Sequence, residues 1–157
     1  MKKKGKNPKT SEKVLGSRDP KSIQEVSGKK QPRAVEDVSY GHLKAAWRIN
    51  RMQLMDPYSW RKLPTDKIEY VHKKLSEFEQ RTWNEIFVDD KRRNHPLPVS
   101  ELKCHQARKW MEDNMPGEDQ LWTLRLSGAE RIWGIFREGL YQVVFWDPSH
   151  LIWEVYK

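Results

Sequence analysis

An arginine inside a predicted strand is the first residue whose type and position could do chemistry. Arg131 lies near the start of a mostly apolar segment, residues 130–137, whose composition is typical of a β-strand. A mid-strand arginine usually reaches solvent or pairs with a carboxylate, here Asp147 or Glu130. Alternatively, the sheet holds the guanidinium rigidly to bind a phosphate, which its planar fork of donors suits well. The sequence leaves both interpretations open.

A second set of candidates lies between residues 89 and 98. His95 precedes Pro96, in a segment that must be extended because proline biases the preceding residue away from helix. His95 could be a base or ligand of a site, or an exposed loop histidine. Lys91, Arg92 and Arg93 form the one dense basic cluster of the chain after residue 33. This cluster is either a solvated loop or, together with His95, a contact for the RNA backbone.

Other reaction classes have weaker support. Cys104 and His105 are adjacent, and no CxxC or HxxxH spacing accompanies them, so no zinc site is predicted. The sequence also lacks the glycine-rich loops that cradle phosphates of nucleotide cofactors. We therefore expect neither a metal nor a cofactor.

Two amphipathic helices are predicted to help position these residues. Residues 66–81 form a helix, because four apolar residues recur at steps of three, four and three: Ile68, Val71, Leu75 and Phe78. Residues 101–114 form a second helix, with Ser100 as its cap. Residues 43–54 fit either a helix or a short strand.

The last third of the chain is predicted to be a sheet. Strands are expected at 121–126, 130–137, 140–146 and 151–156. A two-residue turn at 138–139 would pair Arg131 with Trp146. A tight turn at 127–128 would pair Arg125 with Glu130, whereas a longer turn would pair it with Arg131. The predicted fold is α+β, with two helices packed on one face of a four- to five-stranded, mostly antiparallel sheet.

Charge divides the chain into two parts. Residues 1–33 contain eleven Lys/Arg and three Asp/Glu, a net charge of +8, whereas residues 34–157 contain nineteen of each sign. Residues 1–36 hold no aromatic residue and are predicted to be a disordered basic tail, which either aids solubility or tethers the protein to RNA or a ribosome. Residues 37–157 should form one α+β domain. A single cysteine and the lack of a long apolar run are expected of a cytoplasmic protein with no membrane span.

Two motifs in the C-terminal third are similar to those of a known family. From Leu124 to Ile132, a Leu-Arg strand leads through a glycine turn into an Arg-Ile strand. Val143 to Phe145 are followed by His150 and Tyr156. Both motifs resemble RelE/ParE-like bacterial toxins, whose closing strands often end in a histidine and a terminal tyrosine. The motifs that carry the resemblance lie within residues 120–157, and the order strand, helix, helix, strands extends it to about residues 44–157. The chain could represent a separate prophage- or plasmid-type branch of the family.

The resemblance implies an endoribonuclease. Attack of the ribose 2′-OH on the adjacent phosphate needs a proton acceptor, a proton donor and cations that stabilise the developing charge. Arg125 and Arg131 would stabilise this charge, His150 would act as general acid or base, and Tyr156 would orient or donate. RNA or the ribosome and a cognate antitoxin protein are the implied partners. In the alternatives, His150 only holds its turn, and the protein is an inactive relative or a protein- or RNA-binding module of a phage or mobile element.

Removing the basic tail should leave folding unchanged, because the tail has too little apolar surface to pack. A chain that starts at Val35 should melt at nearly the same temperature as the full chain. A large loss of thermal stability in the shorter chain would show that the tail packs on the domain.

Overall fold

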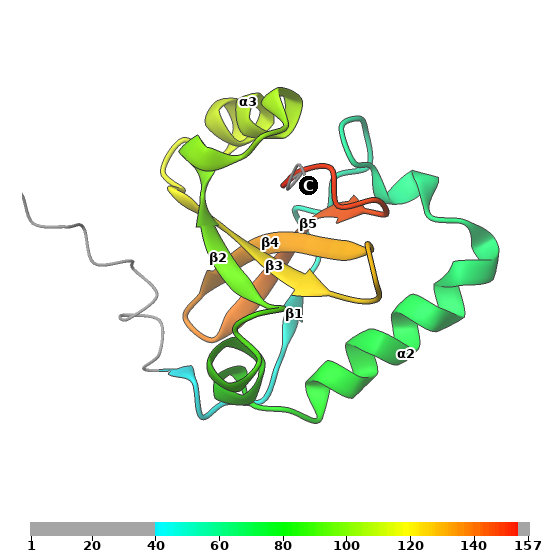
Figure 1. The fold of residues 1–157 in the computed structure, drawn as a ribbon, viewed down its shortest axis with the longest axis vertical. Helices are drawn as coiled ribbons and strands as arrows, with labels where there is room; N and C mark the ends of the chain where they lie inside the picture. The colour runs from blue at the N-terminus through cyan, green and yellow to red at the C-terminus, as the bar shows by residue number, and fades with distance from the viewer. Residues whose placement is uncertain (1–39, 154–157) are drawn as a thin grey trace, which may run out of the picture. The chain divides into compact units, whose positions relative to one another are not determined.

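The computed structural model describes residues 40–153, which form a five-stranded sheet with a helix on either side (Figure 1). The α-helices are α2 (Ile68–Glu79) and α3 (His105–Asn114), and a short π-helix, Glu85–Asp89, lies between them along the chain. The strands are β1 (Trp47–Arg48), β2 (His95–Pro98), β3 (Gln120–Arg125), β4 (Arg131–Arg137) and β5 (Leu140–Asp147). Their order is β1-β5-β4-β3-β2, with β1 parallel to β5 and the other pairs antiparallel. The predicted tail and the chain from residue 154 onward lie outside the described residues.

The α+β class and the mostly antiparallel sheet are confirmed. Residues 43–54, which the sequence left open, contain the short edge strand β1. β2 lies between the two helices along the chain, so the observed order has one strand more than the toxin resemblance implies. Its two prolines are tolerated because β2 is an edge strand, which needs hydrogen bonds on one side only. No helix within residues 40–153 is long and apolar enough to cross a membrane.

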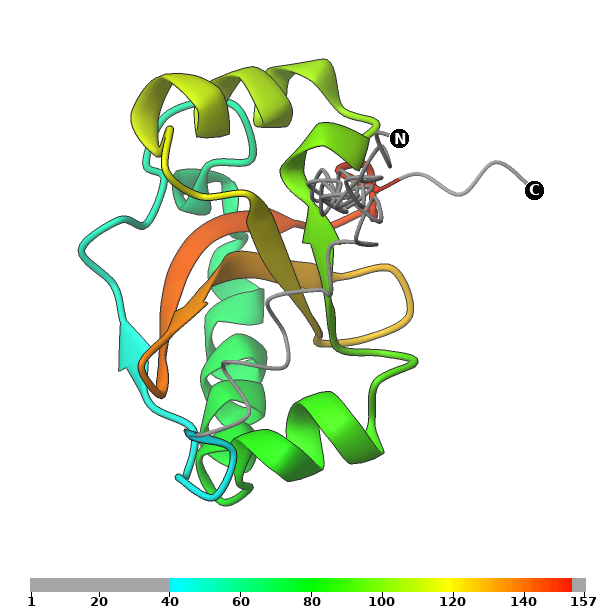
Figure 2. The same ribbon diagram turned by 90° about the vertical axis from the view of Figure 1, so that its left-hand side faces the viewer.

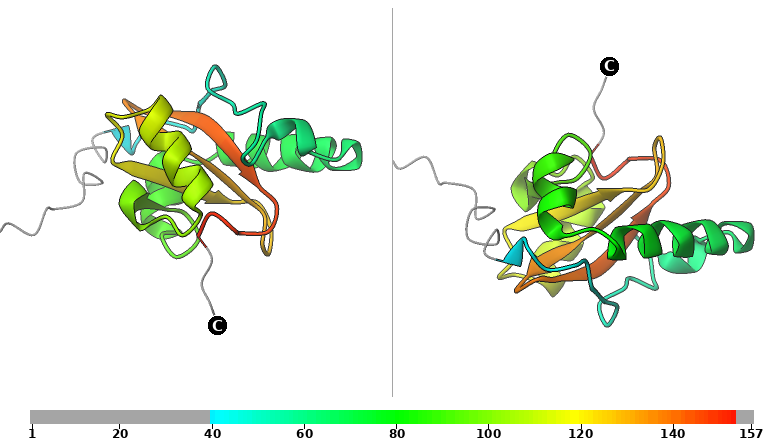
Figure 3. Two further views of the ribbon diagram at one scale, coloured as in Figure 1. Left: turned by 90° about the horizontal axis from the view of Figure 1, so that it is seen from above. Right: turned by 90° about the horizontal axis from the view of Figure 1, so that it is seen from below.

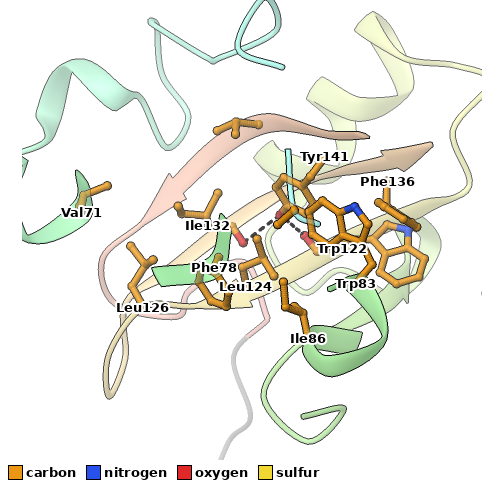
Figure 4. Packing of buried hydrophobic residues seen from close by; sticks show 12 residues of the cluster. Val71, Phe78, Trp83, Ile86, Trp122, Leu124, Leu126, Ile132, Phe136 and Tyr141 are labelled. Carbon is orange, nitrogen blue, oxygen red and sulfur yellow. Dashed lines mark hydrogen bonds between the residues drawn. The ribbon is translucent and has the colours of Figure 1, made fainter. Parts of the chain in front are cut away.

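The two helices lie on opposite faces of the sheet, whereas the prediction placed them on one face (Figures 2 and 3). The reason is that consecutive residues of β3 and β4 are buried, so these strands present apolar surface on both sides and need two covers. The α2 core, drawn in Figure 4, joins Val71 and Phe78 to sheet residues that include Trp122, Leu124, Ile132 and Phe136. The α3 core joins Ala107 and Met111 to sheet residues that include Leu121, Trp133, Ile135 and Phe145.

The first predicted helix agrees with the structure within two residues at either end. A 3₁₀ turn, Thr65–Lys67, precedes α2. Val71 and Phe78 are buried and Leu75 is partly buried, as the apolar spacing predicts. Ile68 is 52% exposed instead, because the first turn of α2 extends past the edge of the sheet (Figure 1).

The second predicted helix is wrong in its first turn. Residues Val99–Glu101 form a 3₁₀ turn, and α3 begins only at His105, so Ser100 does not cap it. Between the two, Leu102 is extended and fully buried in the α3 core. A continuous helix is interrupted because Leu102 packs inward and the Cys104 backbone N–H donates to the Ile152 carbonyl (3.3 Å).

A β-bulge changes the predicted register of the β4–β5 hairpin. The pairs next to the turn, Arg137 with Leu140 and Ile135 with Gln142, follow the prediction. At Gly134 the register shifts, so that Arg131 pairs with Asp147 and not with Trp146. The residue left over in β5 is Val144, whose carbonyl accepts hydrogen bonds from the Gln53 N–H (2.8 Å) and from Trp60 Nε1 (3.1 Å). The bulge is therefore stabilised by a segment distant in sequence.

The predicted last strand, 151–156, is wrong for its described part. Leu151 belongs to no element, Ile152 and Trp153 lie in a turn, and the side chain of Asp147 accepts the backbone N–H groups of Ser149, Leu151 and Ile152. These donors are thus unavailable for a strand ladder.

Gly134→Ala should destabilise the fold, because an added Cβ would lie 2.3 Å from the Gln142 carbonyl oxygen and 2.6 Å from the Tyr141 ring. We expect a loss of about 1–3 kcal/mol in the free energy of unfolding, measured by urea denaturation. Gly128→Ala is the matched control, because nothing lies within 4 Å of its Cβ. Equal stability of the two variants would contradict this account of the bulge.

Candidate functional site

Three charged residues form a row across the end of the sheet. Arg125 of β3 pairs with Arg131 of β4, and Arg131 pairs with Asp147 of β5. Residues that pair directly across strands share one face, so all three side chains lie on the side of the sheet that carries the α3 core. The longer of the two turns considered at 127–128 is therefore the correct one, and it brings the two arginines together.

The two guanidinium groups converge on one carbonyl. Arg125 Nε and Arg131 Nη1 each donate to the Ser127 carbonyl oxygen at 3.0 Å. Arg131 Nη1 also donates to the carbonyls of Gly128 and Glu130, both at 3.1 Å. Arg131 is only 8% exposed, and burial followed by the charge of Arg125 lowers its pKa, while Asp147 acts in the opposite direction. The β3–β4 loop thus holds two like charges side by side.

Neither carboxylate that the sequence offers to Arg131 forms an ion pair with it. The buried Asp147 accepts from Trp133 Nε1 (3.2 Å) in addition to the three backbone N–H groups of its turn. The buried Glu130 accepts from Lys67 Nζ (3.2 Å) and from Trp146 Nε1 (3.3 Å). Within the described residues, no ion pair joins Arg125 or Arg131 to a carboxylate. An approaching anion would be the counter-ion that these arginines lack.

His150 lies within electrostatic range of both arginines. Burial lowers its pKa most, and the charges of Arg131, Arg125 and His95 act in the same direction, whereas Asp147 raises it. The residue adopts a left-handed conformation, with φ of 60°, on the turn that Asp147 stabilises. Arg125, Arg131 and His150, which the sequence proposed as one site, are therefore close enough to influence one another.

His95 belongs to the same end of the sheet. It pairs with Thr123 across β2 and β3, and its Nδ1 and the Thr123 hydroxyl are buried without a hydrogen-bond partner. Burial lowers the pKa of His95, and Arg131 lowers it further, while a hydrogen bond with the Lys91 backbone raises it. His95 is thus a partly buried member of the site and not an exposed loop residue.

The basic cluster lies on the loop beside this site. Lys91, Arg92 and Arg93 are exposed, and Arg93 Nε lies 3.7 Å from Asp90 Oδ1. Arg93 also lines a cleft of about 430 Å³ that reaches Arg125. Tyr156 lies outside the described residues. No group of three potential metal ligands occurs among residues 40–153.

Three residues have supporting roles in the site that the sequence did not predict. Ser127 supplies the shared carbonyl, Asp147 supports the turn of His150, and the buried Asn94 accepts the Arg125 backbone N–H at 2.9 Å. Only Asp147 had a recognisable signal, since an Asp-Pro-Ser sequence is typical of a turn in which the carboxylate accepts backbone N–H groups.

Comparisons with protein-family models, with curated proteins and with solved structures found no match to this chain. The similarity to RelE/ParE-like toxins stays a prediction, and the function has to be inferred from the site itself.

Arg125→Gln should raise the pKa of His150 but leave that of His95 unchanged, because Arg125 lowers only the former. Proton NMR of the histidine Cε1–H signals against pH measures both values. In the unmodified protein both should titrate below the ordinary value near 6.5. Added inorganic phosphate should raise both, because an anion favours the imidazolium. An unchanged His150 titration in the variant would show that Arg125 and His150 do not share a site.

Proposed function

We propose that Arg125, Arg131 and His150 bind a phosphodiester of RNA and cleave it, with the ribose 2′-OH as the nucleophile. The observation that carries the proposal is the pair of guanidinium groups, fixed on the Ser127 carbonyl, unpaired with any carboxylate of the described residues and close to a histidine. Guanidinium groups in this arrangement suit the oxygens of a phosphate. RNA, free or bound to the ribosome, is the implied partner.

The reaction needs a proton acceptor near the 2′-OH. A His150 with a lowered pKa is mostly neutral at pH 7 and can take that proton. The 2′-oxygen then bonds to phosphorus, and Arg125 and Arg131 stabilise the charge that develops on the phosphorane oxygens. The bond from phosphorus to the 5′-oxygen breaks, and this oxygen takes up a proton, for which Tyr156 is the candidate. The products are a 2′,3′-cyclic phosphate and a 5′-hydroxyl.

The resemblance to RelE/ParE-like toxins supports the same proposal from the sequence side. It adds two expectations, growth arrest on expression and inhibition by a cognate antitoxin protein. Growth arrest that disappears in a His150→Asn variant would connect the toxin-like behaviour to this site.

One observation favours a second candidate, an RNA-binding module without catalysis. Arg131 Nη1 donates to three carbonyls of the β3–β4 loop, so part of this guanidinium stabilises the loop and is not free to contact a phosphate. In that case the arginines would still bind phosphate, but His150 would not be needed for any activity.

His150→Asn should lower the rate of RNA cleavage about 10²- to 10⁴-fold, because it removes the proton acceptor. Arg125→Ala should lower it about 10²- to 10³-fold through loss of charge stabilisation. The assay follows a labelled RNA and identifies the cyclic phosphate on the product. His72→Asn, an exposed histidine of α2, is the matched control and should retain full activity.

Two results would reject the proposal in different ways. Equal cleavage by the His150→Asn and His72→Asn variants would place the reaction elsewhere. RNA binding without cleavage, weakened by Arg125→Ala but not by His150→Asn, would establish the binding module instead.

A further inference from the structure

A cleft beside the proposed site has a charged lining that the cleavage reaction does not use. It lies between the C-terminal half of α2, the loop before β2 and the β3–β4 loop, and its volume is about 430 Å³. We refer to it as the α2 cleft. Its charged lining residues are Lys74, Glu77, Arg81, Asp90, Arg93 and Arg125.

The α2 cleft carries an excess of positive charge. Four of its lining residues are cations and two are carboxylates. Glu77 pairs with Lys74 (2.9 Å), and Asp90 lies near both Arg81 (3.5 Å) and Arg93 (3.7 Å). Both carboxylates are thus engaged by cations, and Arg125 is left without one. An anionic ligand would enter the cleft against little repulsion.

The lining favours a sugar-phosphate backbone over a nucleobase. The two apolar lining residues, Phe78 and Leu126, are only 7% and 5% exposed, so they offer no open face on which a base could stack. The accessible groups are guanidinium, ammonium, amide and carbonyl groups, which contact phosphate and sugar without reading sequence. The volume lies within the range of small-ligand sites.

Arg125 connects the cleft to the proposed active site. It lines the α2 cleft, and its Nε shares the Ser127 carbonyl with Arg131. The Arg125 backbone is fixed by Asn94, which also lines the cleft. Arg125 is the last residue of β3, so an RNA strand that passes around this end of the sheet from the phosphate at the two arginines would bring its next phosphates to the cleft.

We propose that the α2 cleft binds the phosphates next to the cleaved one in a single-stranded RNA, without regard to base identity. This inference rests on the proposed function, because it takes the phosphate at Arg125 and Arg131 as its starting point. Lys74 and Arg93 are the residues that contact the neighbouring phosphates.

The test measures binding of a fluorescent single-stranded RNA of about eight nucleotides, 2′-O-methylated so that it cannot react, over a range of salt concentrations. Lys74→Ala and Arg93→Ala should each weaken binding about 3- to 10-fold. Each should also reduce the slope of log affinity against log salt by about 0.7, the value for one lost phosphate contact on a single strand. RNAs of different base sequence should be affected equally.

Lys73→Ala is the matched control, since Lys73 is the exposed neighbour of Lys74 on α2 and does not line the cleft. It should bind like the unmodified protein. Arg93 has a side chain that is 63% exposed, so its variant should fold normally. The unmodified protein should cleave a dinucleotide, which is too short to reach the cleft, and Lys73→Ala should cleave it at the same rate.

The outcomes separate this inference from the proposed function. If Lys74→Ala and Arg93→Ala bind like Lys73→Ala while the dinucleotide is cleaved, the cleft inference is wrong and the proposed function stands. If the dinucleotide is not cleaved but both variants lose affinity and salt slope, the cleft binds RNA and the catalytic proposal fails. Loss of affinity for one base sequence only would overturn the assignment of the cleft to the backbone.

Discussion

The space between β4 and β5 at Gly134 is too small for any side chain, and β5 carries its extra residue at the same point. Beyond the bulge, the register is shifted by one residue. Without the shift, Arg131 would face Trp146, and Asp147 would point toward the α2 core. With it, Asp147 lies on the side of Arg131, where its carboxylate forms the turn that carries His150. Which residues face the proposed site therefore depends on one bulge, whose extra residue, Val144, precedes Asp147 in the same strand.

The pairing of Arg125 with Arg131 is a local conflict in an otherwise consistent fold. Like charges directly opposite on neighbouring strands are destabilising, and here burial adds to the effect by lowering the pKa of Arg131. The Ser127 carbonyl offsets part of the repulsion by accepting from both guanidinium groups. A fold that keeps such a conflict commonly does so where it binds something, because a bound anion removes the repulsion.

The sequence predicted those features that depend on neighbouring residues. The spacing of Val71, Leu75 and Phe78 located α2, and the Glu138-Gly139 turn, with both residues at positive φ, set the hairpin register next to it. It did not predict the bulge, because the Val144 carbonyl is satisfied by Gln53 and Trp60, which no local pattern connects to it. It did not predict helices on both faces, because a polar residue such as Thr123 within a strand favours a solvent-facing side, whereas Thr123 is buried on the side of the α3 core.

The candidate site was also predicted only in part, because some of its residues come together through contacts between segments distant in sequence. Arg131 stood out because a charge in an apolar strand is conspicuous, and Arg125 followed from the length of one turn. His95 could be assigned to the site only from the pairing of β2 with β3. The sequence did not predict β2 as a strand, because its two prolines are typical of a loop. Asn94 accepts the Arg125 backbone N–H through its amide oxygen, and Ser127 accepts from Arg125 through its backbone carbonyl. The residue type alone does not predict either hydrogen bond.

Residues 34–157 have no net charge, yet the proposed site concentrates positive charge. The reason lies in how the nearby carboxylates are used. Glu130 accepts from Lys67 and Trp146, Asp147 is saturated by backbone N–H groups, and Asp90 lies near two arginines. The field that a phosphate would meet is set by these pairings and not by composition. A domain with no net charge can therefore present a local positive field to an anion at one end of its sheet.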